Sequence, residues 1–98
     1  MFHKLSPRDH ELLTMLSGEA AEIIHIKEKI FQHGMDSSHA DYKNWPNRNL
    51  LEKEIGDFLG ILDEIIDKKI IDPDAIQVWR RRKWSKALQY THHQGDEE

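Results

Sequence analysis

The feature that most restricts the fold of this chain is a long helical pattern near its beginning. Ser6-Pro7 is a typical helix start, with a hydroxyl to cap free amides and a proline at the first helical position, and Gly34 is the next strong stop. Between them apolar residues recur at steps of three and four, which is the period of a helix. They are Leu12, Leu16, Ile23, Ile26 and Ile30. We therefore predict a helix over residues 7–33.

A helix of this length constrains assembly as well as fold. It is about 40 Å long, whereas a compact globule of 98 residues is about 34 Å across. A chain of this size also buries only about two-thirds of the surface of its unfolded state. We expect the helix to protrude or to pack against another subunit, and we predict a homodimer or homotetramer.

Two more helices are predicted after a loop. Residues 34–47 are rich in turn formers and have no apolar period, which indicates a loop. A second helix is expected over about residues 48–69, and a third, less amphipathic helix over about residues 73–90. The apolar stripe of the second helix is Leu51, Ile55, Phe58, Leu62 and Ile65. The predicted fold class is all-α, an antiparallel helical bundle of three main helices that is completed by oligomerisation.

Composition excludes several classes of protein. The 14 Lys and Arg and 18 Asp and Glu give a formal net charge of −4, which disfavours nucleic-acid binding through the global field. No cysteine is present, so disulfides and thiolate chemistry are excluded, and no apolar run approaches the ~20 residues that span a bilayer. We expect one domain over residues 1–98, with a disordered polar tail over 92–98, in the cytoplasm and away from membranes.

Carboxylates interrupt the apolar stripes of the first two predicted helices. Glu19 occupies the middle of the first stripe at helical spacing, and Glu22 lies one turn further on nearly the same face. In the second helix Glu54 and Asp57, again at i and i+3, interrupt a row of apolar residues beside the main stripe. A lone carboxylate on an apolar face is costly unless it is neutralised, paired or bound to a cation.

Two such pairs predict one shared cation site. If the two helices pack antiparallel, as neighbours in bundles commonly do, the pairs converge into one cluster of oxygen ligands. Carboxylates without histidine or sulfur select hard cations, of which Mg²⁺ is the usual one and Mn²⁺ a substitute. The alternative is that the acids lie at the edges of the stripes, solvated or paired with lysines such as Lys27, Lys29 and Lys53.

The same residues resemble the signature of a known enzyme family. Residues 19–22, EAAE, followed by residues 54–57, EIGD, are similar to the ExxE…ExxD pattern of the MazG-like all-α nucleoside triphosphate pyrophosphohydrolases. The likeness to small phage and bacterial members extends through most of the chain. Two features depart from the family: Gly18 stands where members often have the first of two consecutive acids, and the loop over 34–47 is long.

The resemblance implies a Mg²⁺-dependent enzyme that hydrolyses a nucleoside triphosphate, ribo or deoxy, between its α- and β-phosphates. It implies catalytic and metal-binding roles for four acids, because an acidic site can hold a polyphosphate only through bridging cations. These are Glu19, Glu22, Glu54 and Asp57. The likeness to phage members, some of which remove dGTP, favours dGTP or GTP as substrate in nucleotide-pool control, in the host cytoplasm if the chain is phage-encoded.

Position suggests further contacts to such a substrate. Lys29 lies on the same face as the first acidic pair, about two turns further on, where it would reach the distal phosphates; a solvated lysine is the alternative. Leu12 and Met15 precede the acids on that face and are candidate contacts for the base. Trp45 and Asn49, at the loop exit, are two more candidates, although Trp45 can instead anchor the loop on the core.

Two other function classes remain open. One is a non-enzymatic helical oligomerisation module, in which the four acids would be exposed and would tolerate alanine. The other is DNA binding through the basic residues 80–83 and the flanking Trp79 and Trp84. Four consecutive residues point all round a helix, so nucleic acid is the less favoured partner. The seven histidines show no HExxH arrangement that would indicate zinc.

Overall fold

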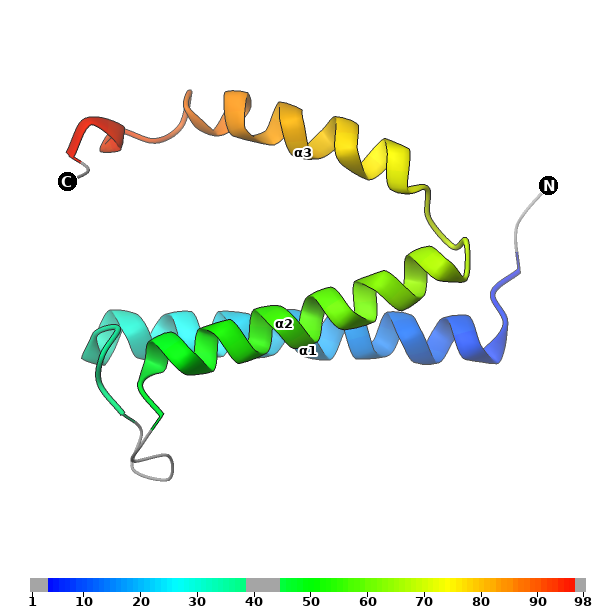
Figure 1. Ribbon diagram of the computed structural model, residues 1–98, viewed down its shortest axis with the longest axis horizontal. Helices are drawn as coiled ribbons and strands as arrows, with labels where there is room; N and C mark the ends of the chain where they lie inside the picture. The colour runs from blue at the N-terminus through cyan, green and yellow to red at the C-terminus, as the bar shows by residue number, and fades with distance from the viewer. Residues whose placement is uncertain (1–3, 39–44, 97–98) are drawn as a thin grey trace.

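The computed structural model describes residues 4–38 and 45–96, which form three α-helices and a short 3₁₀ turn (Figure 1). The elements are α1 over Pro7–His33, α2 over Asn47–Asp67, α3 over Pro73–Ala87 and η1 over Gln94–Asp96. In this part of the chain the only β-type pairing is an isolated bridge between Ser38 and Pro46, so the prediction of an all-α fold is confirmed. None of the helices formed by these residues has the length and apolar content needed to cross a membrane.

α1 begins and ends where the sequence predicts, because both of its ends are capped. At the start, the Ser6 hydroxyl accepts a hydrogen bond from the Asp9 N–H and the Asp9 carboxylate accepts one from the Ser6 N–H, each at 3.0 Å. At the end, Gly34 has a φ of 90°, which glycine adopts without steric cost, and its N–H donates to the Ile30 carbonyl at 2.8 Å. α1 is therefore a single helix of 27 residues.

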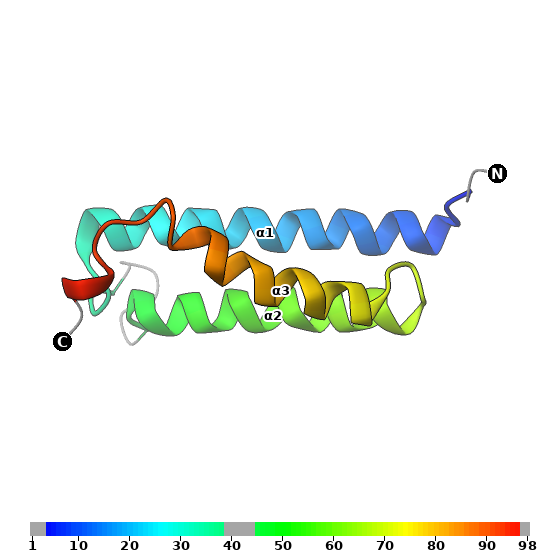
Figure 2. The ribbon, with the colours of Figure 1, turned by 90° about the horizontal axis from the view of Figure 1, so that it is seen from above.

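α1 and α2 pack side by side and antiparallel, as Figures 1 and 2 both show. The buried apolar residues of the described chain are Leu12 and Ile26 on α1, and Leu50 and Ile65 on α2. The antiparallel packing predicted for the two acid-bearing helices is confirmed. This pair of helices contains the core of the molecule.

The face of α2 that packs on α1 matches the predicted stripe only in part. Ile65, which belongs to the stripe, is buried as predicted. Ile55, placed on the stripe by its spacing, is exposed, whereas Leu50, outside the stripe, is buried. Apolar residues cover about half of the circumference of α2, so helical periodicity alone does not fix which part of this surface packs. α2 is turned so that the neighbouring row, which contains Leu50 and Glu54, also faces α1.

The first residue of α2 ties this helix to the end of α1. Asn47 is 2% exposed. Its side-chain amide donates to the Gly34 carbonyl at 3.0 Å, and its backbone N–H donates to the Ser37 carbonyl at 2.8 Å. The described ends of the predicted loop are thus held together at one end of the α1–α2 pair, and residues 39–44 of that loop lie outside the described part of the chain.

α3 is packed against neither of the other helices (Figure 1). Asp72 caps its start by accepting a hydrogen bond from the Asp74 N–H at 2.9 Å, and it ends at Ala87 rather than near Tyr90 as predicted. It has no buried residue. The radius of gyration is 17.0 Å, against about 13 Å for a compact chain of this length. Within one chain the bundle therefore consists of two packed helices, from which α3 projects.

The tail over residues 92–98, predicted to be disordered, contains η1 in its described part. The Nδ1 atom of His93 lies 2.7 Å from an Asp96 carboxylate oxygen, and the Gln94 side-chain amide donates to the Leu88 carbonyl at 3.2 Å. The prediction missed these local hydrogen bonds. Residues 97–98 lie outside the described residues.

Candidate metal centre

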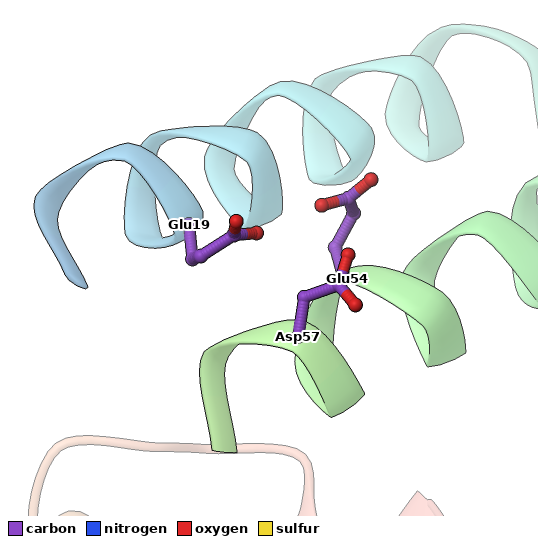
Figure 3. Close-up of side chains that lie close together, drawn as sticks. All are labelled: Glu19, Glu54 and Asp57. Carbon is purple, nitrogen blue, oxygen red and sulfur yellow. The ribbon is translucent and has the colours of Figure 1, made fainter. Parts of the chain in front are cut away.

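Three of the four predicted carboxylates come together between α1 and α2. Glu19 lies near the middle of α1, and Glu54 and Asp57 lie on successive turns of α2, so the antiparallel pairing brings them opposite one another (Figure 3). One carboxylate oxygen from each residue lies within 4.8 Å of those of the other two. We call these residues the acidic triad. Glu19 and Glu54 are half-buried and Asp57 is exposed, so the triad is open to solvent on one side.

Lys53 is the cation nearest to the triad among the described residues. Its ammonium lies 2.8 Å from an Asp57 oxygen and 3.4 Å from a Glu54 oxygen. The hydrogen bonds to Asp57 and then Glu54, together with their negative charge, raise the pKa of Lys53. The lysine pairing that the sequence left open as an alternative is therefore present for Glu54 and Asp57. Lys27, by contrast, pairs with Glu28 at 2.7 Å, away from the triad.

Glu19 is the triad member whose ionisation is opposed by its surroundings. Its pKa is raised above the ordinary value of 4.5, first by partial desolvation between the helices, and then by the negative charges of Asp57 and Glu54. The positive charge of Lys53 acts in the opposite direction. The negative charge around Glu19 thus exceeds the positive charge of Lys53, and a bound cation would reduce the repulsion between the carboxylates.

The donor set of the triad suits a hard divalent cation. Three carboxylates, without sulfur or imidazole, are the ligands that Mg²⁺ and Mn²⁺ prefer. In an octahedral Mg²⁺ shell with bonds of about 2.1 Å, neighbouring oxygens are about 3 Å apart and opposite ones about 4 Å. The triad oxygens, within 4.8 Å, would need to close by about 1 Å to share one ion. Ordinary side-chain motion supplies a movement of that size.

Glu22, the fourth predicted carboxylate, lies outside the triad. Its side chain is exposed, and it forms part of the wall of a neighbouring pocket together with Glu54. The i, i+3 spacing correctly placed Glu22 near the site, but α2 faces Glu19 more directly. A direct role for Glu22 in metal binding stays a prediction.

A pocket of about 360 Å³ adjoins the triad on the side of the loop. Its wall contains a carboxylate pair, two lysines, a histidine, a tryptophan and two aliphatic residues. They are Glu22, His25, Ile26, Lys29, Trp45, Leu50, Lys53 and Glu54. Two predicted substrate contacts, Lys29 and Trp45, therefore lie in one pocket beside the acids. The wall of this pocket thus combines an aromatic face, ammonium groups and carboxylates.

The other predicted substrate contacts do not line this pocket. Leu12 is 1% exposed, because it packs in the core, and this corrects its assignment as a contact for the base. Met15 is exposed, but it lies on the N-terminal side of Glu19, whereas Trp45 lies on the opposite side of the triad. Asn49 is exposed beside the start of α2 and is absent from the pocket wall. Residues on opposite sides of the triad cannot all contact one base.

The sequence-based prediction missed several residues of the site. His25 follows Glu22 by three residues, and this spacing was the signal that could have placed it beside Lys29 on the pocket wall. Leu50 lines the same wall because of the rotation of α2. Asn47, which holds the start of α2 and hence the position of Glu54, had no signal in the sequence.

Comparisons of this chain with protein-family models, with curated proteins and with solved structures give no match. The chemistry of the site therefore has to follow from its own residues. These are three carboxylates on two antiparallel helices, one lysine that partly neutralises them, and a pocket with Lys29 and Trp45 on its wall.

Proposed function

We propose that this protein is a Mg²⁺-dependent nucleotide pyrophosphohydrolase of the MazG-like type, which converts a nucleoside or deoxynucleoside triphosphate and water to the monophosphate and pyrophosphate. It would act as a homodimer or homotetramer in nucleotide-pool control, with dGTP or GTP as the preferred substrate. The observation that supports this proposal most strongly is the acidic triad, whose carboxylates come from two helices that the sequence marks with the same i, i+3 pattern.

In this proposal the acidic triad binds cations that also contact the phosphate groups of the substrate. Glu19, Glu54 and Asp57 would bind Mg²⁺ or Mn²⁺, which supplies charge neutralisation at the α-phosphate and activates water when bound. Lys53 must then leave Asp57, and its ammonium becomes available to a phosphate oxygen. Glu22, beside Glu54 on the pocket wall, can complete the ligand set or accept the proton of the attacking water.

The pocket supplies the remaining contacts in this proposal. Lys29 lies two turns from Glu22 along α1, at a distance that suits the distal phosphates. Trp45 offers a flat aromatic face to a base, at the loop side of the triad. Stacking is tolerant of base identity, so a preference for guanine has to come from hydrogen bonds, for which His25 is a candidate on the pocket wall.

The test is release of pyrophosphate and monophosphate from each common NTP and dNTP by purified protein with Mg²⁺. We expect activity that is abolished by EDTA and restored by Mg²⁺ or Mn²⁺. Glu54→Gln should lower it by at least about 100-fold, since even outer-shell partners of metal ligands are worth about 10–100-fold. Glu11→Gln, which removes an exposed acid at the start of α1, is the matched control and should leave it unchanged. No pyrophosphate from any substrate would refute the proposal.

A second candidate function is a helical oligomerisation module without catalysis. It is favoured by one observation, the unpacked α3 with its exposed Trp79 and Trp84. In that case the Lys53 ion pairs would be all that the acids require, and neither Mg²⁺ nor a nucleotide would change the melting temperature.

A further inference from the structure

Among the described residues, α3 is a helix that does not pack against α1 or α2. Trp79 and Trp84 are 65% and 68% exposed. Val78 and, just beyond the helix, Leu88 are exposed as well. Trp79 and Trp84 lie on different sides of the helix, in two separate hollows. Large aromatic side chains left this exposed mark a surface that another molecule can cover.

The accessible surface of the chain is too large for a self-contained monomer. It is 8348 Å², whereas a compact protein of this mass exposes about 5,800 Å². The excess is about 2,500 Å² per chain, and obligate homodimers bury about 1,000–2,500 Å² per partner. The excess surface is thus of the size that one more copy of the chain can cover.

The charges of α3 and α2 are opposite and equal in size. α3 contains five Lys and Arg and one Asp, a net charge of +4, and α2 contains two Lys and Arg and six Asp and Glu, a net charge of −4. Opposite net charges on two helices favour their association and disfavour that of two like helices. An acidic helix of the same kind of chain is therefore a suitable partner for α3.

The outer face of α2, turned away from α1, offers α3 a matching surface. Ile55 and Leu59 are 41% and 49% exposed on it, and Glu52 and Asp63 lie before and after them at helical spacing. Gly56 and Gly60 lie on the same side with open space around them, so another helix can approach closely. This face combines an apolar centre with acidic ends.

One face of α3 has the complementary pattern. Ile76, Trp79, Arg80 and Lys83 line one shallow hollow on its surface. Its apolar side chains would meet Ile55 and Leu59 of α2, while its cations meet the flanking acids. The two faces are also similar in length, since residues 52–63 of α2 extend over about 16 Å and the hollow of α3, which reaches from Ile76 to Lys86, extends over about 15 Å.

We propose that α3 of one chain packs on the outer face of α2 of a second copy, and that the second copy returns the same contact. Such an isologous exchange closes a two-fold dimer and covers the face of α3 that contains Ile76 and Trp79. The inference concerns assembly and does not depend on catalysis, so either proposal can fail while the other stands.

The test is sedimentation velocity at micromolar concentration with two charge-reversed variants. The α3 variant carries Arg80→Glu and Lys83→Glu, and the α2 variant carries Glu52→Lys and Asp63→Lys. We expect a dimer for the unmodified chain and at least a tenfold weaker dimer for each variant alone, because each then opposes like charges. An equimolar mixture of the two variants should recover the dimer, since both reciprocal contacts become complementary again.

Matched controls separate this result from a general effect of charge or folding. The control variant with Lys4→Glu and Arg8→Glu changes the net charge by the same amount as the α3 variant, but at exposed positions at and just before the start of α1. It should leave the dimer intact. Circular dichroism shows whether each variant keeps its helices. The unmodified protein gives a second readout: carbodiimide cross-links between α3 lysines and α2 acids should join ¹⁴N chains to ¹⁵N chains in a mixed sample.

Several outcomes would overturn the inference. They are a monomer at all concentrations, a dimer that both variants leave unchanged, a mixture that stays monomeric, or cross-links confined to one chain. Binding of a short DNA duplex by α3, weakened by salt and by the α3 variant, would assign the same face to nucleic acid in place of a second copy. The acids Asp72 and Asp74 at the start of α3 oppose a phosphate backbone, which favours the protein partner.

Discussion

The α1–α2 pair and α3 differ in where their apolar side chains find a packing partner. In the pair, Leu12 and Ile65 are each 1% exposed, and the two helices bury one another. In α3 no residue is buried. Net charge follows the same division, because α2 has a net charge of −4 and α3 has a net charge of +4. The α1–α2 pair can therefore position a site by itself, whereas α3 depends on another molecule to cover its apolar side chains.

The largest effect expected from this comparison is on stability. Ile65→Ala removes a buried side chain from the α1–α2 core and should lower the free energy of unfolding by about 2–5 kcal/mol. Val78→Ala on α3, opposite its hollowed face, should change it by only about 0.5 kcal/mol or less. Urea denaturation at one protein concentration measures both. Equal losses of unfolding free energy in the two variants would show that α3 shares the core of the α1–α2 pair, which would contradict the difference between them.

A smaller effect is expected for the lysine that neutralises the triad. The raised pKa of Lys53 means that its ion pairs contribute stability at pH 7, which is lost only as the pH rises through that raised value. Lys53→Gln should therefore lower the melting temperature in EDTA at pH 7. It should also enlarge the rise that Mg²⁺ produces, because the cation no longer displaces an ammonium.

Lys27→Gln is the matched control for this prediction, because Lys27 pairs only with Glu28 among the described residues. Its response to Mg²⁺ should equal that of the unmodified protein. If Lys53→Gln and Lys27→Gln respond alike, the triad does not bind the cation.

The smallest effect is expected for Glu19 and depends on pH. Because its pKa is raised above 4.5, protonation of Glu19 stabilises the fold at low pH, and this contribution is lost as the pH rises through the raised value. At pH 7 without divalent cations, Glu19→Gln should melt at a higher temperature than the unmodified protein. The difference should shrink as the pH falls below 4.5. A lower melting temperature for Glu19→Gln at pH 7 would contradict the assigned electrostatics.

Most bounds of the helices were predictable because their signals are local, and the exception is the end of α3, which lies at Ala87 rather than near Tyr90. Ser6-Pro7, Gly34 and Asp72-Pro73 determine helix ends through hydrogen bonds within a few residues, and the structure has those bonds. The convergence of Glu19 with Glu54 and Asp57 followed from spacing and antiparallel packing, and it is confirmed as geometry.

The rest depended on contacts between elements, which spacing does not encode. α2 has apolar residues on both of its faces, so the sequence did not show that Leu50 packs while Ile55 stays exposed. That rotation determines which acids meet, and it leaves Glu22 on the pocket wall. α3 was expected to join the bundle, but its apolar residues are too scattered to form a stripe against its own chain.

We propose that the acidic triad binds a divalent cation and that the protein needs this cation to bind a nucleoside triphosphate. Its most direct test is the melting temperature with Mg²⁺ alone, with an α,β-methylene triphosphate alone, and with both, for the unmodified protein and for Glu54→Gln. We expect a rise well beyond the sum of the separate effects only when both ligands meet the unmodified protein. An equal response of Glu54→Gln, or no response of either protein, would contradict the claim.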